Sequence, residues 1–431
     1  MLAAFAVVVA QAPLASTASA YVAAEVAAPS IESFYATRGG RLIWFGPTLT
    51  DTSAATAFIE LLRSADADGL NPQSYPIAAL EDAIRGLQAK DFPSIARADR
   101  LFSEVLVRFA RDLRRDSTGE MIWVDQSLRP AAASPEKLLN DFASAGSQRE
   151  YIAEMRWMNP VYVGLRDALL SGGQKSGQDQ VLRLNLERAR VLPMPIGRYL
   201  IVNASAARLT LYDGAREVDS MKVVVGKRTQ ATPMMAAFIR YTSLNPYWNV
   251  PPDLTAERIA PNVVKEGLSY LEKKGYQVLS SWGDDARILD PATIDWQTVA
   301  DGRAEIRVRQ LPGPENAMGQ MKFMFPNSQG VYLHDTPQKE LLAEASRMFS
   351  GGCVRLEDAP RLARWLHGRA LEPSGAAPEQ HVDMKDPVPV FITYLTAVPE
   401  EGKIAYYRDV YGRDAQALAK LGTGSTLASR H

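Results

Sequence analysis

Two short stretches decide the fold and the chemistry expected of this chain: GVYLHDTP at residues 330–337 and FSGGCVRL at residues 349–356. His334 ends a β-type run, so its side chain can leave the sheet and face a cleft. Cys353 lies 19 residues later and follows Gly351 and Gly352, which let backbone N–H groups approach a substrate carbonyl as an oxyanion hole. Arg355 adds a positive charge that stabilises a thiolate or binds a carboxylate. These residue types favour nucleophilic catalysis by Cys353 with His334 as its base.

A purely structural interpretation of the same residues stays open, with a Gly-Gly turn, an inert cysteine and a solvent-exposed histidine. Cys353 is the one cysteine in the 431-residue sequence, which excludes an intramolecular disulfide and any metal site built on a cysteine pair. The remaining histidines, His367, His381 and His431, have no matching partners in the sequence, so we expect incidental or surface roles for them.

Composition limits the class of protein. Hydrophobic residues make up 46% and charged residues 23%, which is ordinary for a globular protein and excludes disorder of the whole chain. Lys and Arg number 48 against 49 Asp and Glu, so no overall positive field attracts nucleic acid or anionic lipid. The length of 431 residues predicts two or three domains.

The first 20 residues are typical of a cleaved signal peptide. An apolar run from Leu2 to Ala10 is followed by the small-x-small pattern Ala18-Ser19-Ala20, although no Lys or Arg precedes Arg38. An apolar tail with no targeting role is the alternative. The run is too short to span a bilayer, and no later stretch is long and apolar enough, so we expect a soluble exported protein. An unpaired thiol in an oxidising compartment is unusual and marks Cys353 as reactive.

Hydrophobic periodicity divides the chain into a helical part and a β-rich part. Helices are predicted at 54–63, 78–88, 95–114 and 136–143. The Gly- and Ser-rich stretch 171–178 is typical of a flexible linker and marks a domain boundary. Strands are predicted at 199–203, 207–212, 220–225, 238–244, 321–325, 331–333 and 388–395, with a hairpin turn at Asp213-Gly214 and one helix at 357–368.

A more polar segment, residues 252–305, interrupts the predicted strands. It contains a predicted helix at 261–274 and the tryptophans Trp282 and Trp296. We interpret it as an insertion into the β domain.

The Cys353 region resembles the signature of the L,D-transpeptidases, which have a YkuD-type catalytic domain. In that family a histidine precedes a Ser-x-Gly-Cys-x-Arg/Asn block by just under twenty residues, and the block here is SGGCVR at 350–355. Many members have a second histidine where this chain has Gly351, and that departure leaves His334 as the only candidate base in the motif. A small residue at this position is similar to the YcbB-like branch of the family.

Further stretches are similar to the same branch: LNLER at 184–188 with Leu192-Pro193, Gly226-Lys227 with Thr232-Pro233, NPYWNVP at 245–251, RQLPGP at 309–314 with NAMG at 316–319, and Phe34-Tyr35 with Asp68-Gly69-Leu70 and Pro72. The resemblance covers about residues 30–415. The peptidoglycan-binding module that the branch often carries between its two domains has no counterpart here, where only the linker stands.

The resemblance implies a multidomain α+β protein. We expect a helical scaffold domain at 30–178, which includes the linker, and a mostly β catalytic domain at 184–415. The 252–305 insertion then corresponds to the family's capping lobe, and 416–431 is expected to be a flexible tail. A lid over the site would exclude water and favour aminolysis over hydrolysis.

The resemblance also implies a reaction and a place for it, the periplasm. The Cys353 thiolate attacks the carbonyl between a diamino acid and D-Ala in a peptidoglycan tetrapeptide stem. His334 transfers the protons, and the backbone N–H groups of Gly352 and Cys353 hold the oxyanion. An acceptor stem amine then resolves the acyl-enzyme as a 3→3 cross-link. No metal or cofactor is expected, nor is a nucleic-acid partner; other cell-wall synthesis proteins are potential partners, and carbapenems are expected to acylate Cys353.

Four residues are expected to shape the substrate pocket, each with a structural alternative. Arg355 binds a stem carboxylate or forms a structural salt bridge, and Tyr332 lines the pocket or packs in its strand. Ser350 shapes the pocket beside the nucleophile. Trp248 lines the cleft or belongs to a core.

Other functions stay open at this point. The acceptor of the acyl group is a stem, a protein lysine or water, so the enzyme could instead attach proteins to peptidoglycan or hydrolyse it. A non-catalytic peptidoglycan-binding scaffold protein would not need the His334 and Cys353 pair. A secreted cysteine peptidase of another type should show a third orienting residue and a papain-like cysteine context, and neither is visible.

Overall fold

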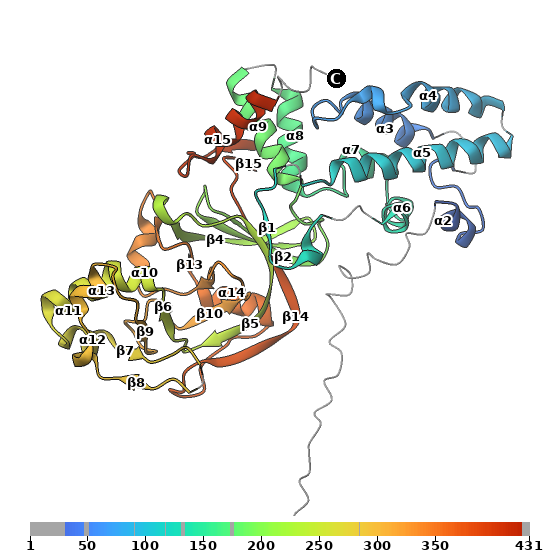
Figure 1. Cartoon of the computed structure of the whole chain (residues 1–431). Helices are drawn as coiled ribbons and strands as arrows, with labels where there is room; N and C mark the ends of the chain where they lie inside the picture. The colour runs from blue at the N-terminus through green and yellow to red at the C-terminus, as the bar shows by residue number, and fades with distance from the viewer. Residues whose placement is uncertain are drawn as a thin grey trace, which may run out of the picture.

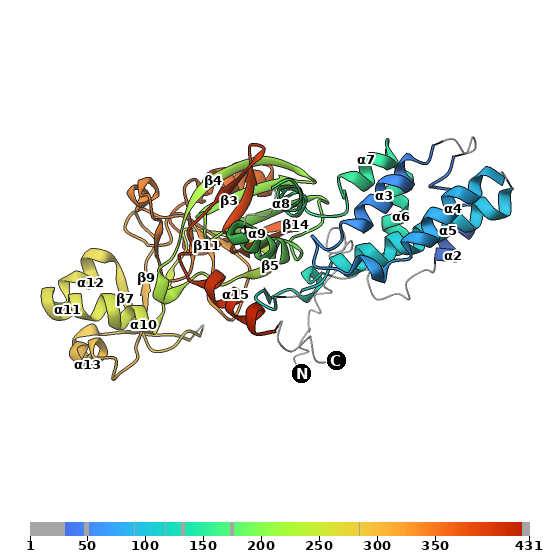
Figure 2. The same cartoon turned by 90° about the horizontal axis from the view of Figure 1, so that it is seen from above.

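The computed structural model describes residues 31–46, 51–89, 91–116, 118–130, 134–172, 176–283 and 285–424. The segment 1–20, predicted as a signal peptide, lies outside these residues. The chain forms a helical N-terminal region and then a mostly β region, into which a smaller mixed lobe is inserted between β5 and β10 (Figure 1). Seen from above, the helical region and the lobe lie at opposite ends of the β region (Figure 2).

The N-terminal region is helical, as predicted. Its helices are α2 (Ile31–Thr37), α3 (Ser53–Arg63), α4 (Ile77–Gly86), α5 (Phe92–Leu113), α6 (Pro135–Ala143), α7 (Gln148–Ala153), α8 (Pro160–Ser171) and α9 (Ser176–Ala189). The long α5 begins where the Asp91 side chain accepts a hydrogen bond from the Ser94 N–H, a typical N-cap. Its side chains Phe102, Leu106 and Phe109 are fully buried, so this one apolar face organises the helical core.

A buried carboxylate ties the N-terminal segment to α5. Asp99 accepts hydrogen bonds from the N–H groups of Ile43, Trp44 and Phe45 and from the hydroxyl of Tyr35. Burial raises the pKa of the Asp99 carboxyl, and these four donors oppose that rise. The Asp99 carboxylate therefore supplies acceptors for the backbone N–H groups of residues 43–45.

The β region is built around a sheet that closes on itself. Its strands are β2 (Arg198–Asn203), β3 (Arg208–Asp213), β4 (Arg216–Gly226), β5 (Met235–Leu244), β10 (Met321–Met324), β11 (Leu333–His334), β13 (Val354–Leu356) and β14 (Gln380–Thr393). The order is β5-β10-β11-β13-β4-β3-β2-β14, and β14 also pairs with β5. Strand β12 (Met348–Ser350) pairs with β4, and β1 (Ile122–Trp123), from the helical region, extends the sheet beside β5.

The predicted strands and the 357–368 helix are confirmed, with changes at their ends. The helix is α14 (Ala359–His367). Strand β14 begins at Gln380 rather than at 388, because its polar first half pairs with β5. A final hairpin, β15 (Ala397–Glu400) and β16 (Lys403–Tyr406), follows.

The inserted lobe has its own sheet and core, and it is wider than predicted. Its elements are β6 (Trp248–Val250), α10 (Pro252–Leu254), a π-helical turn (Thr255–Ile259), α11 (Ala260–Glu266), α12 (Ser269–Lys274), β7 (Tyr276–Leu279), β8 (Ile288–Leu289), α13 (Trp296–Ala300) and β9 (Arg307–Gln310). Strands β6 and β9 pair at its base, so the lobe spans 248–310 rather than 252–305. The single helix predicted at 261–274 is wrong, because Gly267 adopts φ +81° and separates α11 from α12.

The two lobe tryptophans have different environments. Trp296 is buried in the core of the lobe, whereas the side chain of Trp282 is 46% exposed. No helix of the described residues has both the length and the apolar character needed to cross a membrane.

Buried polar contacts join the helical and β regions. Arg188 of α9 is fully buried and pairs with Glu120 and with Asp414. Asp414 also accepts a hydrogen bond from Thr396, and Asn185 bonds the same threonine through its side chain. The guanidinium and its two carboxylates therefore fix α9 against the end of the β region.

Two expectations about connecting segments are wrong in part. Helix α15 (Arg413–Gly424) covers most of the expected flexible tail, because Asp414 anchors its first turn, and residues 425–431 lie outside the description. The predicted 171–178 linker is shorter, since α8 ends at Ser171 and α9 begins at Ser176.

Candidate active site

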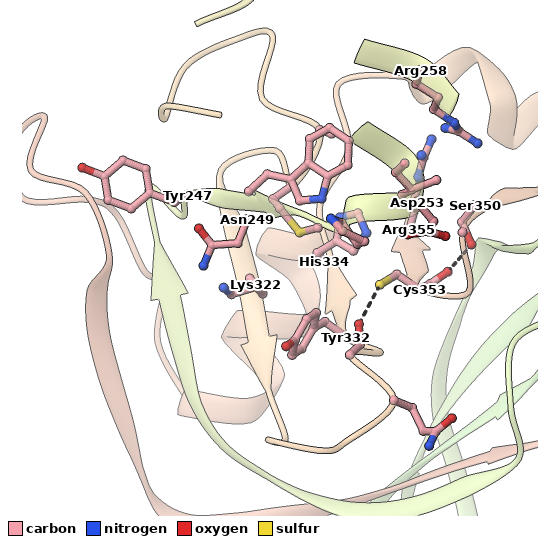
Figure 3. Close-up of a pocket in the computed structure, with 18 of the residues that line it drawn as sticks. Tyr247, Asn249, Asp253, Arg258, Lys322, Tyr332, His334, Ser350, Cys353 and Arg355 are labelled. Carbon is pink, nitrogen blue, oxygen red and sulfur yellow. Dashed lines mark hydrogen bonds between the residues drawn. The ribbon is translucent and has the colours of Figure 1, made fainter. Parts of the chain in front are cut away.

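Strand pairing brings the two sequence motifs together. β11 and β13 run parallel and place His334 opposite Arg355 and Leu333 opposite Val354. Cys353 directly precedes β13, so the thiol and the imidazole are carried by neighbouring strands of one sheet. Figure 3 shows both side chains in the same cavity.

The cavity has a volume of about 410 Å³ and lies between the β region and the lobe. That size suits a peptide or small-molecule ligand. All the predicted pocket residues line it, as do both catalytic candidates: Trp248, Tyr332, His334, Ser350, Cys353 and Arg355.

His334 is held as a neutral base. Its side chain is only 2% exposed, and its Nδ1 lies 2.5 Å from the carbonyl oxygen of Asp335. A carbonyl can only accept, so Nδ1 carries the proton and Nε2 is left unprotonated. Burial, reinforced by the Arg355 guanidinium, lowers the pKa of the imidazole to about 3. At neutral pH the imidazole is therefore uncharged, with Nε2 unprotonated.

Cys353 rests as a thiol. Its Sγ donates a hydrogen bond to the carbonyl oxygen of Gly330 at 3.5 Å. Burial raises its pKa, and the positive charges of Arg355 and Lys322 offset only part of the rise. Arg355 thus lowers the pKa of the thiol, as expected, but the effect of burial is larger. No hydrogen bond to His334 is recorded for the thiol among the described residues, so Gly330 is its recorded partner in this conformation.

The loop before Cys353 has a conformation that requires glycine. Gly352 adopts φ +115°, which side chains rarely allow. Thr232, fully buried, donates from Oγ1 to the Gly352 carbonyl at 2.9 Å and accepts from the Gly226 N–H at 2.8 Å. Ser350 Oγ donates to the Cys353 carbonyl at 2.6 Å. The backbone on both sides of the nucleophile is therefore fixed by hydroxyl groups.

The expected oxyanion donors differ in their availability. The N–H of Gly352 donates to Ser350 Oγ at 3.1 Å, so it must release that bond before it can hold an oxyanion. For the N–H of Cys353, no acceptor is recorded in the described part of the chain. We conclude that Cys353 supplies the donor that is ready in this conformation.

Gly351 lies against the lobe. A Cβ atom built there would lie 3.3 Å from Leu254 Cδ1 of the lobe and 3.4 Å from Gln230 Oε1. A larger side chain at this position would require the Leu254 and Gln230 side chains to shift. The absence of a side chain at Gly351 therefore leaves room for Leu254 of the lobe close to Cys353.

The expected pocket residues keep ligand-binding atoms available. Arg355 donates from Nη1 to Gln338 Oε1 at 2.7 Å, and within the described ranges no ion pair is recorded for it, contrary to the salt-bridge alternative. The Tyr332 ring lies 5.4 Å from the Lys322 ammonium. Trp248 lies at the base of the lobe and contacts Tyr276. Sequence reasoning missed other cavity residues, notably Tyr247, Asn249, Asp253, Arg258, Met318 and Lys322.

His367 and His381 do not line this cavity. His367 Nε2 lies 2.9 Å from the Thr242 hydroxyl, and His381 lies 3.4 Å from Glu379. His431 is outside the described residues. Among the described residues, no group of three or more His, Cys, Asp and Glu side chains is arranged to hold a metal ion.

Comparison with known proteins agrees with the domain organisation. Residues 197–390 match the YkuD family, described as the L,D-transpeptidase catalytic domain, and residues 29–169 match the family described as the scaffold domain. A Haemophilus influenzae protein named as a candidate L,D-transpeptidase is 28% identical over 90% of this chain and 78% of its own length.

The solved structures that match are less similar to this chain in sequence. An L,D-transpeptidase from Mycobacterium smegmatis is 14% identical with a TM-score of 0.23, over 46% of this chain and 58% of its own. L,D-transpeptidase 3 from Mycobacterium tuberculosis, solved with a faropenem-derived adduct, is 14% identical with a TM-score of 0.23, over 46% of this chain and 60% of its own. The chain thus spans less than two thirds of these structures. From the family matches, the chain joins a scaffold domain to a catalytic domain of the YkuD L,D-transpeptidase family.

Proposed function

We propose that the protein is a peptidoglycan L,D-transpeptidase that forms 3→3 cross-links through a thioester on Cys353. The observation that carries the proposal is the pairing of a cavity-lining thiol with a buried imidazole whose Nε2 is free to accept a proton. A non-catalytic peptidoglycan-binding protein would not need this pair.

In the first half-reaction, Cys353 Sγ attacks the carbonyl carbon between the diamino acid and D-Ala of a donor stem while its proton passes to His334 Nε2. The carbonyl oxygen becomes an oxyanion held by the Cys353 N–H. The C–N bond then breaks, His334 gives the proton to the leaving D-Ala amine, and a thioester remains.

In the second half-reaction, the side-chain amine of an acceptor stem attacks the thioester. Its proton passes through His334 to the departing Cys353 sulfur, and a new amide bond forms. The lobe covers the cavity through Leu254, Asp253 and Arg258, which favours an amine over water as the acceptor. A protein lysine as acceptor, or hydrolysis, is an alternative outcome of the same acyl-enzyme.

Two further proposals follow from the thiol chemistry and the sequence. The strained carbonyl of a carbapenem should acylate the same sulfur, with opening of its four-membered ring. The apolar run 2–10 with Ala18-Ser19-Ala20 supports export to the periplasm, where peptidoglycan stems are found.

The test is to incubate the protein with tetrapeptide muropeptides and identify the products by mass spectrometry. We expect cross-linked dimers and free D-Ala from the wild type and neither from Cys353→Ala. A wild type that yields neither product, under conditions where an established L,D-transpeptidase works, would overturn the proposal.

A further inference from the structure

The cavity carries an excess of positive charge that the proposed reaction does not use. Among its lining residues are Lys322, Arg258 and Arg355, against the single carboxylate of Asp253. That carboxylate already accepts a hydrogen bond from Gln230 Nε2 at 2.8 Å. A ligand that enters this cavity is therefore favoured if it is anionic.

Two cations flank His334 in the sheet, Lys322 on β10 and Arg355 on β13. Strands β10 and β11 are antiparallel, and Lys322 lies directly opposite His334. Opposed residues project from the same face with Cβ atoms about 4.5–5.5 Å apart. Figure 3 shows Lys322 on the Tyr247 and Asn249 side of His334, with Arg355 on the other side.

The Lys322 ammonium has unused donors although its side chain is only 13% exposed. Its nearest carboxylate oxygen, Glu379 Oε1, is 3.8 Å away, and no hydrogen bond is recorded for Nζ in the described part of the chain. Glu379 is already engaged, because it accepts from the Tyr247 N–H and the Ser243 hydroxyl, both at 2.8 Å. An ammonium has three N–H donors, so a partly desolvated one in this setting is suited to a ligand carboxylate.

The proposed reaction places a carboxylate within reach. His334 protonates the amine of the leaving residue, so that amine must lie beside the imidazole. In a tetrapeptide donor, the terminal carboxylate is attached to the same carbon as this amine. The cationic neighbours of His334 on the same face of the sheet are Lys322, on β10, and Arg355, on β13.

We propose that Lys322 binds the C-terminal carboxylate of the leaving residue and thereby selects donors that end one residue after the scissile bond. The inference rests on the proposed function and adds the residue that reads the donor's end. Arg355 also flanks His334, but its Nη1 already donates to Gln338, whereas for the Lys322 ammonium no hydrogen bond is recorded among the described residues. A pentapeptide donor moves the carboxylate one residue away, and an amide removes its charge.

The test measures kcat/KM for release of the leaving residue from two synthetic donors, which end in D-Ala or in D-alaninamide. Wild type is compared with Lys322→Met, with the charge-retaining Lys322→Arg, and with Lys403→Met as a control on the remote strand β16. We expect wild type and Lys403→Met to prefer the acid donor by about tenfold to a hundredfold, the range of one charged hydrogen bond. In Lys322→Met, kcat/KM should fall on the acid donor and stay unchanged on the amide donor, so the preference is lost. Lys322→Arg should keep most of the preference.

Equal loss of activity by Lys322→Met on both donors would contradict the inference, because it would show that the charge acts on the thiol and imidazole rather than on the substrate. A wild type that releases the leaving residue from both donors equally would overturn the inference and leave the proposed function standing. A wild type that processes neither donor would overturn the proposed function itself. Thermal melting confirms that each variant is folded.

Discussion

Thr232 Oγ1 donates a hydrogen bond to the carbonyl oxygen of Gly352, at 2.9 Å, one residue before the nucleophile. Thr232 Oγ1 also accepts a hydrogen bond from the Gly226 N–H. The C-terminal segment supports this loop, since the Tyr411 hydroxyl donates to the Gly226 carbonyl at 2.7 Å and Arg413 donates to the Thr232 carbonyl at 2.9 Å. The position of Cys353 thus depends on residues far from it in sequence.

We expect Thr232→Val to reduce the acylation rate of Cys353 by about tenfold to a hundredfold, because a displacement of the nucleophile by a fraction of an ångström is costly. This substitution removes both hydrogen bonds of the Thr232 hydroxyl, and the volume of the side chain stays nearly the same. Thr232→Ser retains the hydroxyl and should retain most of the rate. Single-turnover acylation should show the loss in the rate at saturating donor rather than in KM; a loss confined to KM would assign Thr232 to substrate binding instead.

The pH dependence of acylation tests the protonation state of His334. A lowered pKa means that the imidazole stays neutral as the pH falls below 6.5, and the base is lost only as the pH approaches about 3. We therefore expect the acylation rate to stay nearly constant from about pH 5 to 7. A rate that halves near pH 6.5, the ordinary histidine value, would contradict this account. His334→Gln should lower the rate strongly throughout this range, because it removes the base.

Two polar contacts join the lobe to the loop after β4. Lys227 pairs with Glu257 at 2.7 Å, and Gln230 bonds Asp253 at 2.8 Å. We expect the double variant Lys227→Met with Gln230→Met to loosen the lobe and raise the ratio of hydrolysed to cross-linked product several-fold, because water gains access to the thioester.

The matched control is Lys274→Met, which removes an ion pair between the lobe and Glu315, at 2.6 Å, in the segment that follows the lobe rather than in this loop. Its product ratio should equal that of the wild type. An unchanged ratio in the double variant, measured by chromatography of the muropeptides, would show that these contacts do not restrict water.

Asp99 should be the most sensitive polar residue of the helical region. Asp99→Ala leaves three backbone N–H groups without their acceptor and removes one of the partners of the Tyr35 hydroxyl, and we expect a loss of about 3 kcal/mol or more in folding free energy. Asp141→Ala, which removes an exposed carboxylate paired with Lys137, should have little effect. Thermal unfolding checks both; similar midpoints for the two variants would contradict the role given to Asp99.

Local sequence patterns were enough for several parts of the structure. Helix periodicity located α3 to α6, and the β-type run that ends at His334 located β11, whereas β13, which follows Cys353, was not predicted. The paired motifs themselves identified the two residues that line the cavity. These features depend on neighbours in the chain, which a single sequence displays.

Features that depend on contacts between residues far apart in the chain could not be predicted from the sequence. The helix at 416–424 requires Asp414 to meet Arg188, and the lobe boundary requires β6 to pair with β9. Lys322 looks like an ordinary polar residue of a short strand, and only its register with His334 gives it a role. The bond from the Gly352 N–H to Ser350 likewise depends on how the loop folds back.

The most direct test of the central claim is the intact mass of the protein during turnover of a tetrapeptide donor without an acceptor. The account predicts that wild type gains the mass of the tripeptide acyl group and releases one equivalent of D-Ala, while Cys353→Ala gains nothing. A wild type that releases D-Ala without an adduct on Cys353, even when quenched at early times, or an adduct that persists in Cys353→Ala, would contradict it.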